Sequence, residues 1–345
     1  LHASARPVSG DALADHIPPG TRAVSIFLVN RRPPDVRTPD VAYAFQAQVS
    51  LASPTPFVPR PDLRGAFADD WDERVGDLQY ADTPEFAVGH GISAEWDAGE
   101  GECHVVRTAW MPTAQVERTE TVALAGVKLS MDALGALDGG ESAREALAPL
   151  VSQYRQWIKA TRERQMALNP KRKETAEQLL SLADFAARRI ESGIETLARD
   201  ADALDAFRVA NRAVAGALRQ RLKIDSPSWK AFQLAFILVN LPGLADPADP
   251  NRETVDLLFF PTGGGKTEAY LGLAAFVMVL RRLRHPEEGA RSGAGVSVIM
   301  RYTLRLLTLD QLSRAAGLVC ALELEREKDP QRYGEWPFEI GLWVG

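Results

Sequence analysis

The sequence predicts a multidomain chain with a β-rich N-terminal domain, an α-helical middle domain and a C-terminal α/β P-loop lobe. Three observations predict this order. Short apolar runs separated by Pro, Gly and Asp fill residues 1–130, and apolar residues recur at steps of three and four over residues 131–224. Helical and strand-like runs then alternate over residues 225–345, as in a parallel α/β sheet. A length of 345 residues fits two or three domains.

The first domain contains four runs of strand-like composition. They cover residues 23–29, 42–51, 85–93 and 103–109. Turn-forming segments separate these runs, for example Pro33-Pro34-Asp35 and Gly99-Glu100-Gly101. Several short strands at this spacing favour a β-sandwich or a strongly bent sheet.

The middle domain is predicted to contain two long helices. In the first, one apolar stripe is made by Leu179, Leu182, Ala186, Ile190, Ile194 and Leu197. Asn169 suits the N-cap of this helix, because Pro170 follows at a position where the helix needs no N–H donor. The second helix is expected over residues 203–222, and it ends before the Ser226-Pro227 pair.

The most informative segment of the third domain is a glycine turn between a strand-like and a helical run. After residues 255–260 the sequence reads Pro261-Thr262-Gly263-Gly264-Gly265-Lys266-Thr267, and a helix is predicted from Glu268. Such a turn directs backbone N–H groups and the positive end of a helix dipole at an anion. The lysine supplies charge for the β- and γ-phosphates, and the threonine hydroxyl can bind Mg²⁺. The segment therefore predicts a phosphate-binding loop for ATP and Mg²⁺.

The spacing of this loop narrows the class of protein. The general pattern GxxxxGK[ST] would need a glycine where Phe260 stands. The shorter P-T-G-x-G-K-T form fits instead, and it resembles motif I of superfamily 2 helicases and translocases. We predict Lys266 and Thr267 as the catalytic residues. The nucleotide-binding residues are then predicted to be Thr262, Gly263, Gly264, Gly265, Lys266, Thr267 and Glu268, with Thr267 as the Mg²⁺ ligand.

Two flanking segments carry the other candidate site residues. Upstream, Phe232 can stack on a base and Gln233 can pair with an adenine edge, which resembles a Q motif with lysine at position 230 in place of arginine. Downstream, a predicted strand over residues 296–300 leads into a basic helix start that resembles motif Ia. There we predict contacts to the backbone of DNA of single-stranded character by Arg301, Thr303, Arg305 and Gln311. Gln311 stands farther from Thr303 than that motif requires.

Composition limits the remaining function classes. The net charge of −6 and a pI near 5.6 leave no overall basic field for nucleic acid, so binding would depend on a local groove. Two cysteines, Cys103 and Cys320, are too few for a disulfide framework and fit a reducing cytoplasm. No apolar run is long enough to cross a membrane.

The chain opens on Leu1 and contains no strand ending in Asp-Glu, so we expect it to be a portion that lacks motif II and a second lobe. The carboxylates at residues 322–327 are interpreted as a solvated helix face. The chain alone is therefore expected to bind ATP without turning it over. A third strand is predicted at residues 340–344.

Taken together, residues 232–238, 261–273 and 300–305 resemble the helicase-type subunits of the DISARM anti-phage defence system. Residues 78–80, 87–91, 110–112 and 206–213 are also similar to them. The resemblance implies a first RecA-like lobe in a cytoplasmic bacterial ATP-dependent DNA translocase with a DrmB-type partner subunit. Two alternatives remain open: another class of P-loop NTPase, and an ATP-binding scaffold that does not hydrolyse ATP.

Overall fold

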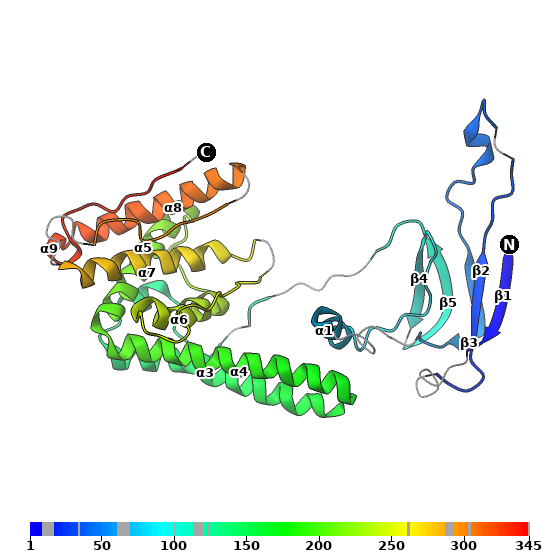
Figure 1. The fold of residues 1–345 in the computed structure, drawn as a ribbon, viewed down its shortest axis with the longest axis horizontal. Helices are drawn as coiled ribbons and strands as arrows, with labels where there is room; N and C mark the ends of the chain where they lie inside the picture. The colour runs from blue at the N-terminus through cyan, green and yellow to red at the C-terminus, as the bar shows by residue number, and fades with distance from the viewer. Residues whose placement is uncertain are drawn as a thin grey trace. The chain divides into compact units, whose positions relative to one another are not determined.

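The computed structural model describes residues 1–8, 17–33, 35–60, 70–99, 101–113, 120–122, 124–260, 263–286, 293–302 and 305–343. The chain divides into two compact units (Figure 1). The first comprises Leu1–Glu117 and Leu168–Ala176, and the second comprises Arg118–Ala167 and Glu177–Gly345. Across the described ranges, no helix has the length and apolarity that a bilayer crossing requires.

The first unit contains two small antiparallel sheets. Strands β1 (His2–Pro7) and β2 (Arg22–Phe27) form one sheet. The other has the order β3-β5-β4, with β3 at Ser50–Phe57, β4 at Ser93–Gly99 and β5 at Glu102–Ala109. The register of β5 shifts against both neighbours, as expected for a bent sheet.

The strands predicted at residues 23–29 and 103–109 are confirmed by β2 and β5. The strand predicted at 42–51 is wrong for most of its length, because a 3₁₀ turn at Pro39–Ala42 precedes it and β3 begins only at Ser50. The strand predicted at 85–93 is also wrong, since β4 begins where that run ends. A tight turn explains the second error: a Cβ on Gly89 would lie 1.6 Å from the carbonyl oxygen of Ile92.

A short helix, α1 (Trp71–Gln79), completes the first unit. The Asp70 carboxylate caps it by accepting hydrogen bonds from the backbone N–H groups of Asp72 and Glu73. Asp77 of α1 pairs with Arg172, whose Nη2 lies 2.8 Å from Asp77 Oδ1.

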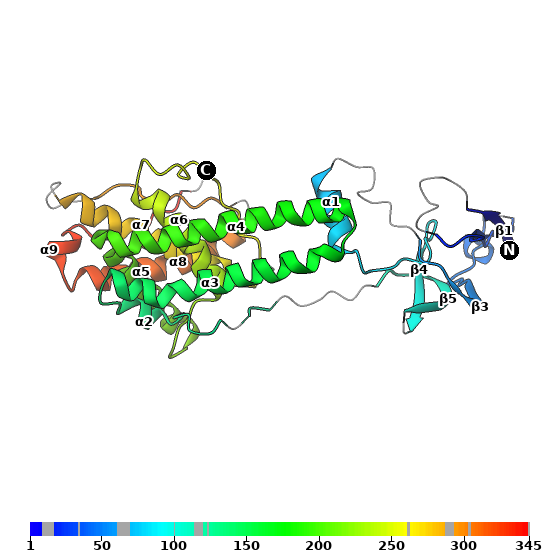
Figure 2. The ribbon, with the colours of Figure 1, turned by 90° about the horizontal axis from the view of Figure 1, so that it is seen from below.

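Two long antiparallel helices dominate the start of the second unit. Helices α3 (Gly140–Arg164) and α4 (Pro170–Arg199) lie side by side in both views (Figures 1 and 2). Ion pairs join them along their length: Arg144–Glu195, Arg155–Glu191 and Arg162–Asp184. The predicted N-cap is confirmed, because Asn169 Oδ1 accepts from the backbone N–H of Arg172 at 2.9 Å.

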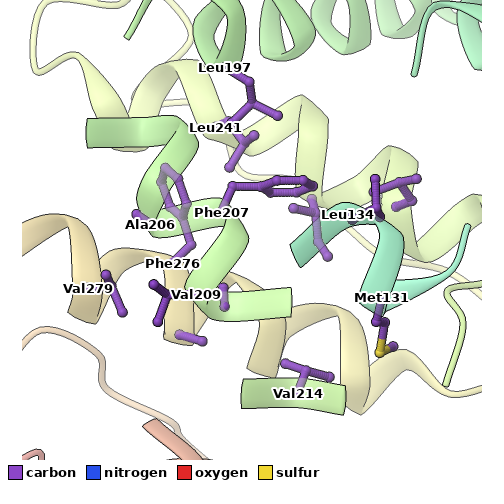
Figure 3. Close-up of a cluster of buried hydrophobic side chains, with 14 of the residues drawn as sticks. Met131, Leu134, Leu197, Ala206, Phe207, Val209, Val214, Leu241, Phe276 and Val279 are labelled. Atoms are coloured by element: carbon purple, nitrogen blue, oxygen red, sulfur yellow. The ribbon is translucent and has the colours of Figure 1, made fainter. Parts of the chain in front are cut away.

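Helix α5 (Ala201–Leu222) lies at the centre of the second unit and packs against α2 (Met131–Gly135), α7 (Lys266–Arg284) and α8 (Arg305–Arg326). Helix α6 (Ala231–Ala245) packs on α7, and a last short helix, α9 (Pro330–Tyr333), packs on α7 and α8. Figure 3 shows Phe207 of α5 and Phe276 of α7 within this shared core. Burial of such side chains contributes about 2–3 kcal/mol each relative to exposure.

The parallel sheet predicted for the α/β lobe is not formed among the described residues. Both of the sheets that these residues form are antiparallel and lie in the first unit, so the described parts of runs 255–260, 296–300 and 340–344 pair with no strand. Several apolar side chains in the first two of these runs stay in solvent, with Leu257 87% and Ile299 85% exposed. Strands are stabilised by hydrogen bonds to paired neighbours, and these runs have no strand neighbour among the described residues. The helices predicted around these runs are confirmed by α6, α7 and α8.

Candidate nucleotide-binding site

The glycine loop has the backbone that its sequence predicts. Gly263 and Gly265 have φ values of 80° and 94°, a left-handed region that favours glycine, and α7 begins directly afterwards at Lys266. A Cβ at position 265 would also lie 2.7 Å from Gln233 Nε2. Pro261 and Thr262 lie outside the described residues, so the predicted contact of Thr262 is untested. The described part of the loop can present N–H groups at the positive end of α7.

Lys266 and Thr267 occupy the first turn of α7. The Lys266 ammonium donates a hydrogen bond to the carbonyl oxygen of Phe260, so the lysine side chain points back toward the start of the loop. Thr267 is buried, and its Oγ1 accepts from the hydroxyl of Tyr270 at 3.0 Å. A glycine turn, a lysine and a threonine hydroxyl in this order have the chemistry to hold phosphates and Mg²⁺. Lys266 would have to leave the Phe260 carbonyl to reach a phosphate.

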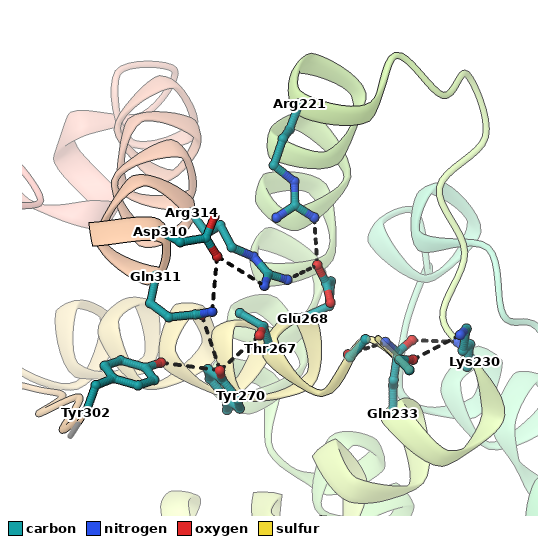
Figure 4. Close-up of polar contacts among 12 residues, drawn as sticks. Arg221, Lys230, Gln233, Thr267, Glu268, Tyr270, Tyr302, Asp310, Gln311 and Arg314 are labelled. Atoms are coloured by element: carbon teal, nitrogen blue, oxygen red, sulfur yellow. Dashed lines mark hydrogen bonds and ion pairs between the residues drawn. The ribbon is translucent and has the colours of Figure 1, made fainter. Parts of the chain in front are cut away.

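Two side chains of the α6 N-terminus hold the backbone of the loop (Figure 4). Gln233 is only 5% exposed; its Nε2 donates to the Gly265 carbonyl at 2.6 Å, and its Oε1 accepts from the Lys230 N–H at 2.7 Å. The Lys230 ammonium donates to the Gly264 carbonyl at 2.9 Å. The amide predicted to contact adenine therefore contacts the loop, and it retains one N–H and one lone pair for a second partner.

An aromatic pair flanks the loop. The rings of Phe232 and Phe260 stack with centroids 4.0 Å apart and planes 9° from parallel. Phe232 thus lies beside the strand-like run that leads into the loop, and it presents a flat apolar surface of the kind on which a base stacks.

Glu268 was predicted to face the nucleotide, and the structure gives its carboxylate two arginine partners. Oε1 lies 2.7 Å from Nη2 of Arg221 on α5 and 2.5 Å from Nη2 of Arg314 on α8. Burial raises the pKa of Glu268, but the hydrogen bond from Arg221 and the charge of Arg314 outweigh burial, and the net pKa is lowered. One carboxylate thus ties the start of α7 to two neighbouring helices.

The residues predicted to contact DNA are only partly described. Arg301 is exposed, and Gln311 on α8 accepts a hydrogen bond from Tyr270 at 3.3 Å. Thr303 lies outside the described residues, and so does the side chain of Arg305, the first residue of α8. The structure therefore brings Gln311 near Thr267 through Tyr270.

Sequence reasoning missed four residues of this site: Arg221, Lys230 as a loop contact, Tyr270 and Arg314. Arg221 and Arg314 lie 47 and 46 residues from their shared partner Glu268, so no local spacing could reveal them. Tyr270 is three residues after Thr267, and that one-turn spacing was a usable signal.

Of the carboxylates at residues 322–327, Glu323 and Glu325 are in helix α8, as predicted, and Glu327 follows the last residue of that helix. The interpretation as a solvated face is wrong for Glu323 and Glu325. Glu325 is buried and pairs with Arg212 and Lys328. Glu323 pairs with Arg326 and accepts from the Phe338 N–H at 2.9 Å. Over the part of the chain that the structure describes, no three His, Cys, Asp or Glu side chains group as a metal site.

No family model matches the chain. The chain is 31% identical over 354 aligned residues to the DISARM protein DrmA of Bacillus paralicheniformis. The similarity covers 93% of this chain and 30% of the relative, so the chain spans less than a third of that protein's length.

Proposed function

Because the chain is DrmA-like over 93% of its length, we propose that it carries the ATP-binding part of a bacterial anti-phage defence protein, an ATP-dependent DNA translocase or helicase. One observation carries the nucleotide part of the proposal. Two left-handed glycines, Gly263 and Gly265, stand directly before a long helix whose first two residues are Lys266 and Thr267. That order of backbone and side chains suits a triphosphate.

In this proposal each described residue near the loop has a separate task. The loop N–H groups and the Lys266 ammonium bind the phosphates, and the Thr267 hydroxyl binds Mg²⁺, which neutralises phosphate charge when it is bound. Phe232 stacks on the base. Gln233 keeps the loop in place through Gly265 and contacts the adenine edge with its remaining N–H and lone pair.

The DNA part of the proposal rests on the likeness to DrmA and on the position of α8. Arg301, Thr303, Arg305 and Gln311 bind the backbone of a strand at the N-terminal end of α8, where the helix dipole favours phosphate. The runs at 255–260 and 296–300 become strands of a RecA-like lobe once the longer protein supplies their neighbours. A DrmB-type partner subunit, a cytoplasmic location and the defence role belong to the same proposal.

A second candidate function is an ATP-binding scaffold without hydrolysis. The contact between the Lys266 ammonium and the Phe260 carbonyl favours it, because Lys266 would have to give up this contact before its ammonium reaches a phosphate. In such a scaffold, nucleotide would order the loop without being consumed. A P-loop NTPase of another class, the third candidate, would hydrolyse ATP without any response to DNA.

ATP hydrolysis by the full-length protein, with and without single-stranded and duplex DNA, separates these functions. We expect stimulation by DNA that disappears in Lys266→Ala and survives in Lys159→Ala, a lysine of α3 exposed to solvent. Hydrolysis that ignores DNA would support the other NTPase class. Nucleotide binding without any hydrolysis would support the scaffold.

A further inference from the structure

We propose that Tyr270 is a positioning residue that couples the ligand state of the Thr267 hydroxyl to the side chain of Gln311. The inference rests on the proposed function, in which Thr267 binds Mg²⁺ and Gln311 contacts DNA. It adds a route by which nucleotide changes the affinity for a strand.

The geometry consists of four side chains joined by hydrogen bonds (Figure 4). The hydroxyl of Tyr270, one turn after Thr267 on α7, lies 3.0 Å from Thr267 Oγ1 and 3.3 Å from Gln311 Oε1. The hydroxyl of Tyr302 donates to the Tyr270 oxygen at 3.2 Å. Tyr302 is in the segment just before α8 and Gln311 is on α8, so Tyr270 connects the loop end of α7 to both.

A phenol has one hydrogen, and this makes the two acceptors of Tyr270 competitors. Tyr270 can donate to Thr267 or to Gln311, but not to both at full strength. Tyr302 donates to one lone pair of the Tyr270 oxygen and leaves the second one open to another donor. Burial raises the pKa of Tyr302, so its hydroxyl keeps its hydrogen at neutral pH. The direction of the Tyr270 hydrogen therefore depends on which acceptor is stronger.

The strength of Thr267 as an acceptor depends on its ligand. When Thr267 Oγ1 gives a lone pair to Mg²⁺, the threonine hydroxyl becomes a weaker acceptor and a stronger donor. Tyr270 then turns its hydrogen to Gln311 Oε1, and Thr267 donates to the Tyr270 oxygen, so every group keeps a partner. No group changes its protonation state in this exchange.

The exchange fixes the orientation of the Gln311 amide. In the structure Gln311 Nε2 donates to Asp310 at 3.3 Å, a long contact that leaves the amide loosely held. A full hydrogen bond from Tyr270 holds Oε1 inward and presents Nε2 outward to an acceptor such as a phosphate. Because the side chain is already ordered, strand binding then costs less entropy.

A separate contact keeps the backbone of α8 in place during this exchange. The Glu268–Arg314 ion pair joins the same two helices, α7 and α8, and Arg314 meets the network at Asp310, whose Oδ2 lies 4.0 Å from Arg314 Nη1. Tyr270 therefore couples the two sites by changing the direction of its hydroxyl hydrogen, without a movement of α8. One neutral hydrogen bond gained or lost corresponds to a change of about fivefold in affinity.

The test is the effect of nucleotide on strand affinity, measured with the whole chain. The Kd for a fluorescent single-stranded oligonucleotide is determined with and without Mg²⁺ and a non-hydrolysable ATP analogue. We expect the analogue to tighten binding about fivefold in the wild type. The ratio of the two Kd values should fall to about one in both Tyr270→Phe and Gln311→Ala, and Tyr154→Phe on α3 should keep the wild-type ratio. Tyr270→Phe and Gln311→Ala are on different helices, so the test still gives an answer if one of the two variants fails to fold.

The outcomes separate this inference from the proposed function. Calorimetric titration with the analogue reports nucleotide binding on its own. If the chain binds analogue and oligonucleotide without coupling, or if Tyr270→Phe keeps the wild-type ratio, the inference is wrong and the proposed function stands. If the wild-type chain binds no analogue, both are wrong.

Discussion

Arg189 of α4 and Asp256, in the run that leads into the glycine loop, form a two-point ion pair. Nη1 lies 2.5 Å from Oδ1 and Nη2 lies 2.7 Å from Oδ2. The Arg189 and Asp256 side chains are only 10% and 18% exposed. This pair fixes the strand-like run onto α4, and so it helps to place the loop that follows.

Removing one partner of that pair should be costly, because the other charge stays buried. We expect Arg189→Ala to lower the free energy of unfolding by about 3 kcal/mol in a urea titration. The matched control is Arg155→Ala on α3, which breaks a pair with Glu191 of α4. The two side chains of that pair are 45% and 50% exposed, so its loss should cost less than about 1 kcal/mol. Equal losses in the two variants would contradict the role given to Arg189.

The close approach of α4 and α6 depends on a glycine. A Cβ on Gly193 would lie 2.0 Å from the carbonyl oxygen of Leu238, so Gly193→Ala should lower the thermal midpoint and cost about 2–3 kcal/mol. The same substitution at Gly317 in α8 meets no atom within 4 Å and should stabilise by about 0.5–1 kcal/mol. Effects of the same sign at the two positions would refute this packing.

Substitution of Gln233 distinguishes two roles of its side chain: holding the glycine loop and recognising the adenine base. Because its amide donates to Gly265 and is also proposed to contact the adenine edge, we expect Gln233→Ala to weaken GTP binding by about tenfold and ATP binding by more than that. Asn240→Ala, which removes an amide that donates to the Phe236 carbonyl within α6, should leave both affinities unchanged. A loss confined to ATP in a calorimetric titration would instead assign Gln233 to the adenine edge.

The Glu268 carboxylate should contribute a defined pH dependence. Its folded-state pKa is lowered by its two arginines, so its stabilisation is present above the unfolded pKa of about 4.3 and is lost as pH falls through the folded pKa. We expect Glu268→Gln to cost about 2–3 kcal/mol at pH 7, with a difference from wild type that shrinks as the pH falls below the unfolded pKa. A difference independent of pH would argue against the pair. Glu191→Gln, in an exposed pair, serves as the control.

Local signals in the sequence were sufficient for the helices and for the backbone of the loop. The apolar stripe of α4, the Asn169-Pro170 start and the glycine turn before Lys266 all depend on residues within a few positions of one another. The same holds for β5, where Val105, Val106 and Thr108 give the run its strand-like composition.

Contacts between distant residues could not be predicted in this way. The partners of Glu268 come from α5 and α8. Glu325 likewise pairs with Arg212, which is 113 residues away in the sequence. Strand pairing has the same difficulty, because run 255–260 has the composition of a buried strand and finds no neighbour among the described residues. Composition indicates that a segment could form a strand. Whether the strand forms depends on whether the rest of the chain provides a neighbouring strand.

The central claim is that the glycine loop binds a nucleoside triphosphate through Lys266. Calorimetric titration of the chain with Mg²⁺ and a non-hydrolysable ATP analogue tests it most directly, with Lys266→Ala and Lys159→Ala alongside. We predict saturable binding by the wild type and by Lys159→Ala, and an affinity lower by about tenfold or more in Lys266→Ala. Wild-type affinity in Lys266→Ala, or no binding by the wild type, would contradict the account.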